Sequence, residues 1–263
     1  MSKATIDQID IPACFADPGA VTGKRVVITG ASRGLGALLT HAFSQAGASV
    51  ALVARTERDL KAVAAQLPGP SLVLGGDVTD EDFNEAAADA TVAEWGGVDA
   101  WICNAGISPI VAGPRQTDAA VWRQVLEVNL TGAFLGARAA ARVMGEGGRL
   151  IFTGSVLGER PRKGLGAYSA SKAGLVGLAK GLALDLAPAG ITVNVVAPGW
   201  FESPLAEAWT SNPELSAAIT GHTALRRWGT STDLAAAYQF LASDASAFIT
   251  GTVLNVDGGY LLV

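Results

Sequence analysis

Short apolar segments of strand type alternate with helical segments along almost the whole chain. The expected strands are Arg25–Thr29, Ser49–Ala54, Leu72–Gly75, Val98–Cys103, Leu150–Thr153, Ile191–Val196 and Thr252–Val256. The expected helices are Gly34–Ala46, Glu57–Gln66, Asp80–Glu94 with Thr79 as N-cap, Asp118–Met144 as one helix or two, Tyr168–Leu186 and Thr232–Ala242. Continuously apolar strands between helices are typical of a parallel sheet that is covered on both faces. The alternation therefore predicts an α/β fold of three layers around a seven-stranded parallel sheet.

Composition excludes several classes of protein. Of 263 residues, 49% are hydrophobic and 16% are charged, which indicates a globular chain and not a disordered one. The net charge is −5 and no long basic run occurs, so we expect no nucleic-acid partner. His41 and His222 are the only histidines, and no cluster has the spacing of metal ligands, so we expect no metal.

The cellular location is expected to be the cytoplasm. Only Cys14 and Cys103 occur, which argues against a disulfide framework and favours a reducing compartment. Residues Met1–Thr22 lack a basic start followed by an apolar run, so they do not form a secretory signal. The uncharged stretch Gly34–Ala54 is too polar to span a bilayer, and we expect a buried helix and strand there with no membrane contact.

A glycine-rich turn follows the first expected strand. The turn reads Gly-x-x-x-Gly-x-Gly, with a strand before it and a helix after it. Glycines allow the backbone to approach a pyrophosphate at the positive N-terminus of a helix. The alternative is a turn whose glycines serve close packing alone. The nucleotide-binding residues expected here are Gly30, Ser32, Arg33, Gly34, Leu35 and Gly36.

The same turn also fits the Gly-x-Ser-x-Gly elbow of serine hydrolases, with Ser32 as nucleophile. His222 follows in the order that such an enzyme requires. However, only one strand precedes Ser32, whereas most of a hydrolase sheet precedes its elbow. We therefore give this alternative little weight.

Three side chains near the fifth strand indicate acid–base chemistry. Tyr168 and Lys172 are four residues apart, so a helix places them on one face, and Ser155 stands where the strand ends. A phenol has a free pKa of about 10, and a neighbouring ammonium favours its ionised form. Such a set suits the interconversion of a carbonyl and an alcohol. A surface tyrosine beside a solvated lysine is the alternative if nothing else agrees.

Further short motifs recur in a fixed order along the chain. They are Asp77-Val78 after the third strand, Asn104-Ala105-Gly106 after the fourth, Asn129 in the long helix, Pro198-Gly199 after the sixth strand, Ser203, and the ending Val256-Asp257-Gly258-Gly259. With the glycine turn and the Ser-Tyr-Lys set, this order resembles the short-chain dehydrogenase/reductase family from about Gly23 to Tyr260. Two mild departures are Cys103, where the family has a first Asn, and Ser203, where it often has Thr.

The resemblance implies a Rossmann fold and a role for each motif. Asn129, Ser155, Tyr168 and Lys172 match the catalytic tetrad of the family. Asp77 and Val78 resemble the pair that holds adenine, and Ser203 the residue that holds the nicotinamide amide. The other implied cofactor contacts are Asn104, Ala105, Gly106, Pro198 and Gly199, with Tyr168 and Lys172 also contacting the cofactor.

The end of the second strand indicates which dinucleotide binds. An acidic residue there would bind a ribose 2′-hydroxyl and repel a 2′-phosphate. The chain has Ala54 followed by Arg55, and Arg33 is near enough to reach the same place. Two guanidinium groups favour the 2′-phosphate of NADP, with NAD less favoured. The alternative is that Arg55 pairs with Glu57.

The function expected from the resemblance is NADP(H)-dependent oxidation–reduction between a ketone and a secondary alcohol. Tyr168 exchanges the proton, Ser155 hydrogen-bonds the substrate oxygen, and Lys172 lowers the pKa of Tyr168 and holds the nicotinamide ribose. Asn129 positions a water that links Lys172 to solvent. A 3-oxoacyl-carrier-protein reductase and an NAD-dependent secondary alcohol dehydrogenase are alternatives. A nucleotide-sensing protein without turnover is disfavoured by the intact Ser-Tyr-Lys set.

The substrate is a small molecule whose pocket we expect to be apolar. Its walls are expected at Ile107–Val111, at Val156–Leu165 and at the insertion Trp200–Gly229, where Trp200, Phe201, Leu205 and Trp209 suggest a mobile lid. The loop before Tyr168 carries Arg160, Arg162 and Lys163, which either meet an acidic group of the substrate or are simply solvated.

We expect one catalytic and dinucleotide-binding domain over residues 23–263, with a lid at about 200–229, preceded by an extension over residues 1–22.

Small residues fall on one side of the expected helix Tyr168–Leu186: Ala170, Ala173, Gly174, Gly177 and Gly181. Each helical glycine costs about 1 kcal/mol relative to alanine, so close approach of another helix is the expected reason. That helix belongs either to the same chain or to a second subunit. With the family resemblance, this favours a homotetramer, with a homodimer as the fallback.

Overall fold

A computed structural model describes residues 20–202 and 210–263 of the chain. Seven parallel strands form one sheet in the order β3-β2-β1-β4-β5-β6-β7. Their bounds are β1 Arg25–Thr29, β2 Ser49–Ala54, β3 Ser71–Gly75, β4 Ala100–Cys103, β5 Arg149–Thr153, β6 Thr192–Pro198 and β7 Val253–Val256. The predicted seven-stranded parallel sheet is confirmed, with β4 beginning two residues later and β6 ending two residues later than expected.

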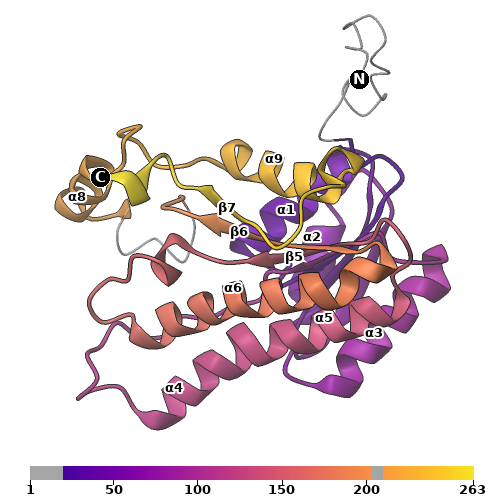
Figure 1. Ribbon diagram of the computed structural model, residues 1–263, viewed down its shortest axis with the longest axis horizontal. Helices are drawn as coiled ribbons and strands as arrows, with labels where there is room; N and C mark the ends of the chain where they lie inside the picture. Colours follow the sequence, from indigo (N-terminus) through magenta and orange to yellow (C-terminus); the bar gives the residue numbers. More distant parts are fainter. Residues whose placement is uncertain (1–19, 203–209) are drawn as a thin grey trace, which may run out of the picture.

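Helices cover both faces of the sheet (Figure 1). Their bounds are α1 Gly34–Gln45, α2 Glu57–Ala64, α3 Glu81–Trp95, α4 Ala119–Leu126, α5 Gly132–Val143, α6 Gly166–Leu186, α8 Pro213–Gly221 and α9 Ser231–Ala242. Helices α3, α5 and α6 lie on one face, and α1 and α9 lie on the other. The three layers make a doubly wound Rossmann fold, as predicted.

Two hydrophobic cores result from the alternation of side chains along the strands. Trp101 and Phe152 point toward the α3, α5 and α6 layer, where Leu175 packs on them. Ile28 and Ile102 point toward the other layer. All five side chains are at most 1% exposed, which explains why the strands are continuously apolar in sequence.

The sheet order reverses direction between β1 and β4, which are hydrogen-bonded neighbours. Successive connections leave this point toward opposite faces of the sheet, so a crevice opens at the carboxyl ends of these two strands. The glycine turn after Thr29 and the segment after Cys103 both begin there. The topology alone therefore places the predicted motifs beside one another.

The expected long helix Asp118–Met144 is continuous but irregular. Helices α4 and α5 are joined by a π-helical turn at Glu127–Thr131, and the backbone at Leu126 and Gly132 stays in the right-handed helical region. Asn129 lies in the middle of this turn. Single π-helical turns inside α-helices are frequent at functional sites, and the sequence pattern did not predict this one.

The expected N-cap of α3 was wrong by one residue. The Asp80 carboxylate accepts a hydrogen bond from the Phe83 amide at 3.2 Å and caps the helix. The Thr79 hydroxyl instead donates to Asp77 at 2.9 Å. A carboxylate at the N-cap also interacts favourably with the helix dipole, which explains the preference for Asp80.

The insertion after β6 contains a helix that the sequence analysis did not predict. A parallel bridge between Phe201 and Gly229 closes its base, and Asn212 caps α8. The predicted cofactor contact Ser203 lies outside the described residues, as do Leu205 and Trp209 of the expected lid and Cys14. No helix in the described ranges is both long and apolar enough to cross a membrane.

Candidate active site

Hydrogen bonds fix the carboxyl ends of β1 and β4 to each other. The Thr29 hydroxyl oxygen accepts from the amides of Asn104 at 2.9 Å and Ala105 at 3.0 Å. The Asn104 amide nitrogen Nδ2 donates in return to the Thr29 carbonyl at 2.9 Å. Thr29 is almost fully buried, so these bonds are protected from water. The floor of the crevice is therefore held in place before any ligand binds.

The glycine turn crosses this floor at close range. A Cβ atom on Gly30 would lie 2.9 Å from the Cα of Ala105, and one on Gly36 would lie 2.1 Å from the Gly30 carbonyl oxygen. Gly30 also has a φ of +70°, which side chains disfavour. Arg33 precedes α1 without a side-chain cap, so the first amides of the helix remain available. This arrangement fits a pyrophosphate at the helix N-terminus.

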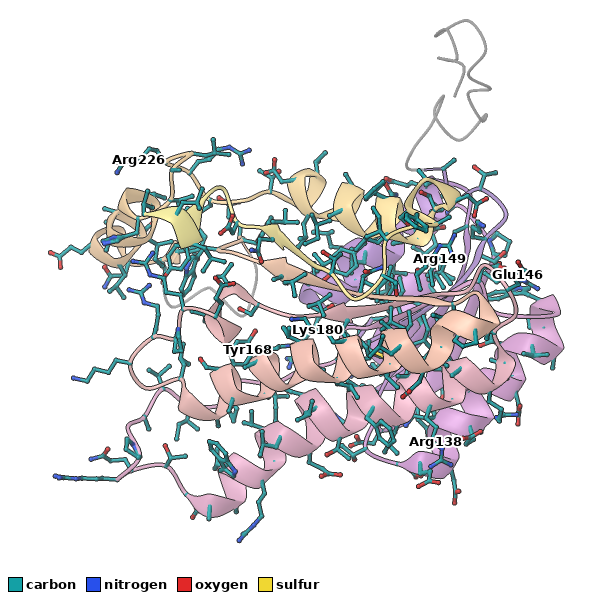
Figure 2. The ribbon with its side chains drawn as sticks, viewed as in Figure 1. Arg138, Glu146, Arg149, Tyr168, Lys180 and Arg226 are labelled. Carbon is teal, nitrogen blue, oxygen red and sulfur yellow. The ribbon has the colours of Figure 1, made fainter. Side chains whose placement is uncertain are left out.

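A cleft of about 650 Å³ extends along the carboxyl edge of the sheet. The predicted residues that line it are Gly30, Ser32, Arg33, Gly34, Leu35, Gly36, Arg55, Asp77, Val78, Asn104, Ala105, Gly106, Ser155, Tyr168, Lys172, Pro198 and Gly199. Asn129 is fully buried and does not line the cleft. Figure 2 shows Tyr168 near the N-terminal end of α6, whereas Arg149 lies at the opposite end of the sheet.

Lys172 is a buried ammonium one turn along α6 from Tyr168. Its side chain is 3% exposed and donates to the Thr153 carbonyl at 2.6 Å. Burial lowers the pKa of Lys172 to about 8. The ammonium nitrogen lies 5.6 Å from the centre of the Tyr168 ring. The helix spacing thus brings the two groups together, as the sequence predicted.

The pKa of the Tyr168 phenol is raised, whereas Lys172 was expected to lower it. Burial raises the pKa of Tyr168, and a smaller opposing effect comes from the hydrogen bond with Ser155. The Lys172 ammonium points to the Thr153 carbonyl, which explains why it is not a cause of the shift. In this state Tyr168 is a protonated phenol, which suits it to donate a proton.

Ser155 is oriented by the short 3₁₀ turn that follows β5. Its hydroxyl oxygen accepts a hydrogen bond from the Leu157 amide at 3.1 Å. The hydroxyl proton is thereby left for the hydrogen bond to Tyr168, from which it can turn to a substrate oxygen. Ser155 and Tyr168 therefore present two hydroxyl donors to the same part of the cleft.

Asn129 supports the wall of the cleft through hydrogen bonds and is not part of the cleft surface. Its Oδ1 accepts from the Ile107 amide at 2.7 Å, and its Nδ2 donates to the Ile107 carbonyl at 3.0 Å and to the Ser171 hydroxyl at 3.1 Å. All these bonds connect the π-helical turn to the segment after β4 and to α6. The side chain fixes the relative position of three elements at the site.

Two residues that sequence reasoning missed complete the network. The Thr153 hydroxyl lies 2.9 Å from the Tyr238 hydroxyl and donates to Asn104 Oδ1 at 3.3 Å. Tyr238 is fully buried on α9, and burial raises the pKa of its phenol. Seventy residues separate Tyr238 from Tyr168, and no local motif surrounds it, so nothing in the sequence signalled its place.

The nucleotide end of the cleft carries two exposed arginines, Arg33 and Arg55. The proposed partner of Arg55, Glu57, instead forms an ion pair with Lys61 at 2.6 Å. Among the described residues, neither arginine forms an ion pair. This removes the alternative in which Arg55 pairs with Glu57, and it leaves two guanidinium groups free for an anionic ligand.

The hydrolase alternative finds no support in the geometry. The His222 ring nitrogen Nδ1 lies 2.9 Å from the Ala218 carbonyl at the end of α8. Neither His222 nor His41 is among the residues that line the cleft around Ser32. A nucleophilic serine needs a base within hydrogen-bonding reach, and the described residues provide none for Ser32.

Comparison with known proteins agrees with this geometry. A family model described as enoyl-(acyl carrier protein) reductase matches residues 30–261. The cis-4-hydroxycyclohexanecarboxylate dehydrogenase of Sinomonas cyclohexanicum is 36% identical over 250 residues, which is 93% of this chain and 100% of that protein. The 3-oxoacyl-[acyl-carrier-protein] reductase of Escherichia coli is 37% identical over 243 residues, 92% of this chain and 98% of its own.

Solved structures extend the comparison to three dimensions. A short chain dehydrogenase from Burkholderia cenocepacia, in complex with NADP, superposes with a TM-score of 0.85 and 33% sequence identity. The match covers 92% of this chain and 99% of that one.

Proposed function

The chain belongs to the short-chain dehydrogenase/reductase family and is an NAD(P)-dependent oxidoreductase acting on CH–OH groups, and we propose that it uses NADP(H). In this proposal it interconverts a ketone and a secondary alcohol, with Tyr168 as acid and base. The observation that carries the proposal is the convergence of Ser155, Tyr168 and Lys172 on the cleft that the glycine turn borders.

In the reductive direction, the Tyr168 hydroxyl donates its proton to the carbonyl oxygen of the substrate. The Ser155 hydroxyl donates a hydrogen bond to the same oxygen and orients the carbonyl. When bound, the dinucleotide supplies hydride to the carbonyl carbon and takes it up in the reverse direction. In alcohol oxidation, Tyr168 accepts the hydroxyl proton.

Lys172 serves the cofactor rather than the acidity of Tyr168 in this proposal. Its position on α6, one turn from Tyr168, suits a hydrogen bond to the nicotinamide ribose. Asn129 acts through the backbone of Ile107 and through Ser171, so we assign it a positioning role. The bound water that we expected it to position stays a prediction.

The preference for NADP rests on Arg33 and Arg55. Both line the nucleotide end of the cleft and form no ion pair among the described residues, so both are available for a 2′-phosphate. The Burkholderia cenocepacia relative with NADP supports the same choice. NAD remains the second candidate.

The substrate class has two candidates among the relatives. The E. coli relative reduces a 3-oxoacyl group on an acyl carrier protein, and the Sinomonas relative oxidises a hydroxylated ring that carries a carboxylate. A 3-oxoacyl reductase is the second function that we propose, because the family model and this relative share the acyl-carrier substrate in their descriptions.

We also propose that residues 23–263 work as one catalytic domain, with 200–229 as its lid. We further propose that the protein forms homotetramers and that it acts in the cytoplasm. Residues 1–19 of the expected extension lie outside the described ranges.

The test is a spectrophotometric screen of ketones, 3-oxoacyl thioesters and sugars, with NADPH and NADH in parallel. We expect NADPH oxidation with at least one ketone or thioester. Tyr168→Phe, which removes only the hydroxyl, should bind NADPH as the parent does and lose most turnover. A Phe variant with a kcat close to that of the parent would refute the assignment of Tyr168.

A further inference from the structure

A second cavity of about 630 Å³ adjoins the catalytic end of the cleft. It shares Ser108, Leu165 and Tyr168 with the cofactor cleft, so a substrate held at Tyr168 can extend into it. Its walls come from the segment after β4, from α4 and from the loop that enters α6.

The two loops that enclose this cavity are fixed to each other. The Ala112 amide donates to the Gly164 carbonyl at 2.9 Å. Gly164 has a φ of +85°, and a Cβ there would lie 2.8 Å from a methyl carbon of Val111. The close contact requires glycine at this position, and it holds the walls of the cavity together without a ligand.

The lining combines apolar side chains with two guanidinium groups. Ile110, Val121 and Trp122 contribute apolar surface. Arg123 and Arg162 are the charged side chains among the described residues that line the cavity, and these residues include no carboxylate. A cavity of this composition suits a ligand with an apolar body and a negative end.

Arg162 is held in place but has no counter-ion within residues 20–202 and 210–263. Its guanidinium lies 5.3 Å from the centre of the Trp200 ring, and the residue is half-buried. Within the described part of the chain it forms no ion pair. Neighbouring Arg160, in contrast, donates to the carbonyls of Tyr260 and Val263 near the C-terminus. The structure thus separates two arginines that the sequence grouped: Arg160 secures the chain end, and Arg162 is available.

The rest of the molecule offers many carboxylates, and several other arginines are paired with them, unlike Arg162. The chain carries 24 acidic and 19 basic residues, so carboxylates are in excess. Away from the cleft, arginines such as Arg25, Arg142 and Arg227 form ion pairs with carboxylates. A half-buried guanidinium that lacks a counter-ion in an acidic protein favours an anion from outside.

We propose that this second cavity binds a carboxylate on the substrate, with Arg162 as the principal contact and Arg123 as a secondary one. The substrate class is then an oxo acid or hydroxy acid whose apolar middle separates the reacting carbon from the carboxylate. The proposal rests on the proposed function, because it assigns the substrate of the same Tyr168 site.

The experiment compares oxo acids with their methyl esters. The series runs from 4-oxopentanoate to 9-oxodecanoate, each against its ester, with NADPH as the second substrate. The variants are R162Q, which removes the charge; R162K, which keeps the charge; and K163Q, which removes an exposed charge that does not line the cavity.

We expect the parent to prefer the acid over its ester at one or more chain lengths. R162Q should lower kcat/KM for that acid at least tenfold, mainly through KM, and change the ester less than twofold. R162K should retain most of the preference, which separates loss of charge from loss of packing on Trp200. K163Q should keep the ratio within twofold of that of the parent.

Three results would overturn the proposal while leaving the proposed function intact. The first is a parent that reduces esters as well as acids at every length. The second is an equal loss for acid and ester in R162Q, and the third is a loss of preference in K163Q as large as in R162Q. If the parent oxidises NADPH with no ketone or thioester of the wider screen, the proposed function fails instead.

Discussion

At the scale of the residue, Lys172 shows how the fold sets the chemistry of one group. Lys172 is 3% exposed, and its ammonium donates a hydrogen bond to the Thr153 carbonyl. Removing a charged group from water disfavours its charged form, which is why burial lowers the pKa of Lys172 from 10.5 to about 8. The same shift makes the stability of the protein depend on pH.

The sign of that dependence follows from proton binding. Between pH 8 and 10.5 the unfolded chain holds a proton on Lys172 that the folded chain has released, so the free energy of unfolding rises with pH. Below pH 8 Lys172 is protonated in both the folded and the unfolded state, so the folded protein bears the full free-energy cost of burying the charge. We therefore predict that Lys172→Met stabilises the cofactor-free protein more at pH 7 than at pH 9.5.

The stabilisation by Lys172→Met should be roughly 2 kcal/mol larger at pH 7 than at pH 9.5. Urea denaturation of parent and variant at both values measures it. Lys180→Met is the matched control, because Lys180 is exposed on the same helix and the substitution should give the same difference at both values. A Lys172→Met difference that does not vary with pH would contradict the prediction.

Arg55 is the residue at which cofactor preference can be tested. We predict that Arg55→Asp weakens NADPH binding by tenfold or more and changes NADH binding much less, because an attraction to the 2′-phosphate is replaced by a repulsion. Fluorescence titration with both dinucleotides measures the two dissociation constants. The control is Arg58→Asp, which changes the same charge on α2 outside the cleft lining. Equal losses for both dinucleotides in Arg55→Asp would show that Arg55 does not contact the phosphate.

At the scale of the element, the π-helical turn explains how one long helix serves the site. The extra residue in the turn shifts the helix face between α4 and α5, which brings Asn129 inward while Phe134 stays exposed. The Asn129 side chain then meets both Ile107 and Ser171. An unbroken α-helix would place its side chains at a different angle beyond this point.

The insertion after β6 is the element that we expect to respond to the substrate. Helix α8 has one fully buried apolar side chain, Ile219, and Trp228 joins it through a hydrogen bond to the Ser216 hydroxyl at 2.8 Å. So few buried contacts predict a low free energy of local opening. We predict that amides of 210–229 exchange faster than those of β5 in the free protein, and slow when NADPH and a substrate analogue bind.

Hydrogen exchange followed by mass spectrometry measures this response, with peptides from α3 as the internal control. NADPH alone and NADPH with the analogue are compared, so that the two contributions separate. Slow exchange over 210–229 in the free protein, unchanged by ligand, would show that the insertion is not a lid.

At the scale of the whole molecule, one side of α6 lacks a partner among the residues that the structure describes. Gly177 and Gly181 are exposed, and a Cβ on either would meet no atom within 4 Å. Leu184 is 78% exposed on the same helix, and Phe134 is 40% exposed on α5 beside it. Gly174 differs from the expectation, because a Cβ there would lie 2.9 Å from Leu130 of the same chain.

Part of the small-residue pattern therefore serves packing inside the chain, and part remains open to a second subunit. We predict a homotetramer, in which α6 and the α4–α5 helix meet their copies across a two-fold axis. Gly177→Trp should break the assembly without a clash inside the chain, since the added side chain enters open space. Gly145→Trp is the control, at another exposed glycine with open space around it.

Light scattering at micromolar concentration measures the outcome. Each chain has a mass of 26.7 kDa, so a tetramer and a monomer are clearly separated. A parent protein that scatters as a monomer would refute the prediction, and so would a Gly177→Trp variant that assembles as the parent does.

The sequence by itself determined the features that depend on near neighbours along the chain. The strand and helix alternation predicted the sheet because burial on both faces makes each strand apolar throughout. Glycine at 30 and 36 predicted the nucleotide turn because only a residue without Cβ permits the approach to Ala105 and to the Gly30 carbonyl. The four-residue spacing of Tyr168 and Lys172 predicted their meeting because an α-helix repeats about every four residues.

Only the tertiary structure decided the features that join distant segments. The contact of Tyr238 with Thr153 spans 85 residues, and the separate roles of Arg160 and Arg162 depend on the chain end and on Trp200. The direction of the Tyr168 pKa shift depends on burial by several elements together. No local pattern encodes such contacts, because desolvation and side-chain pairing are set by whichever segments the completed fold brings to the same place.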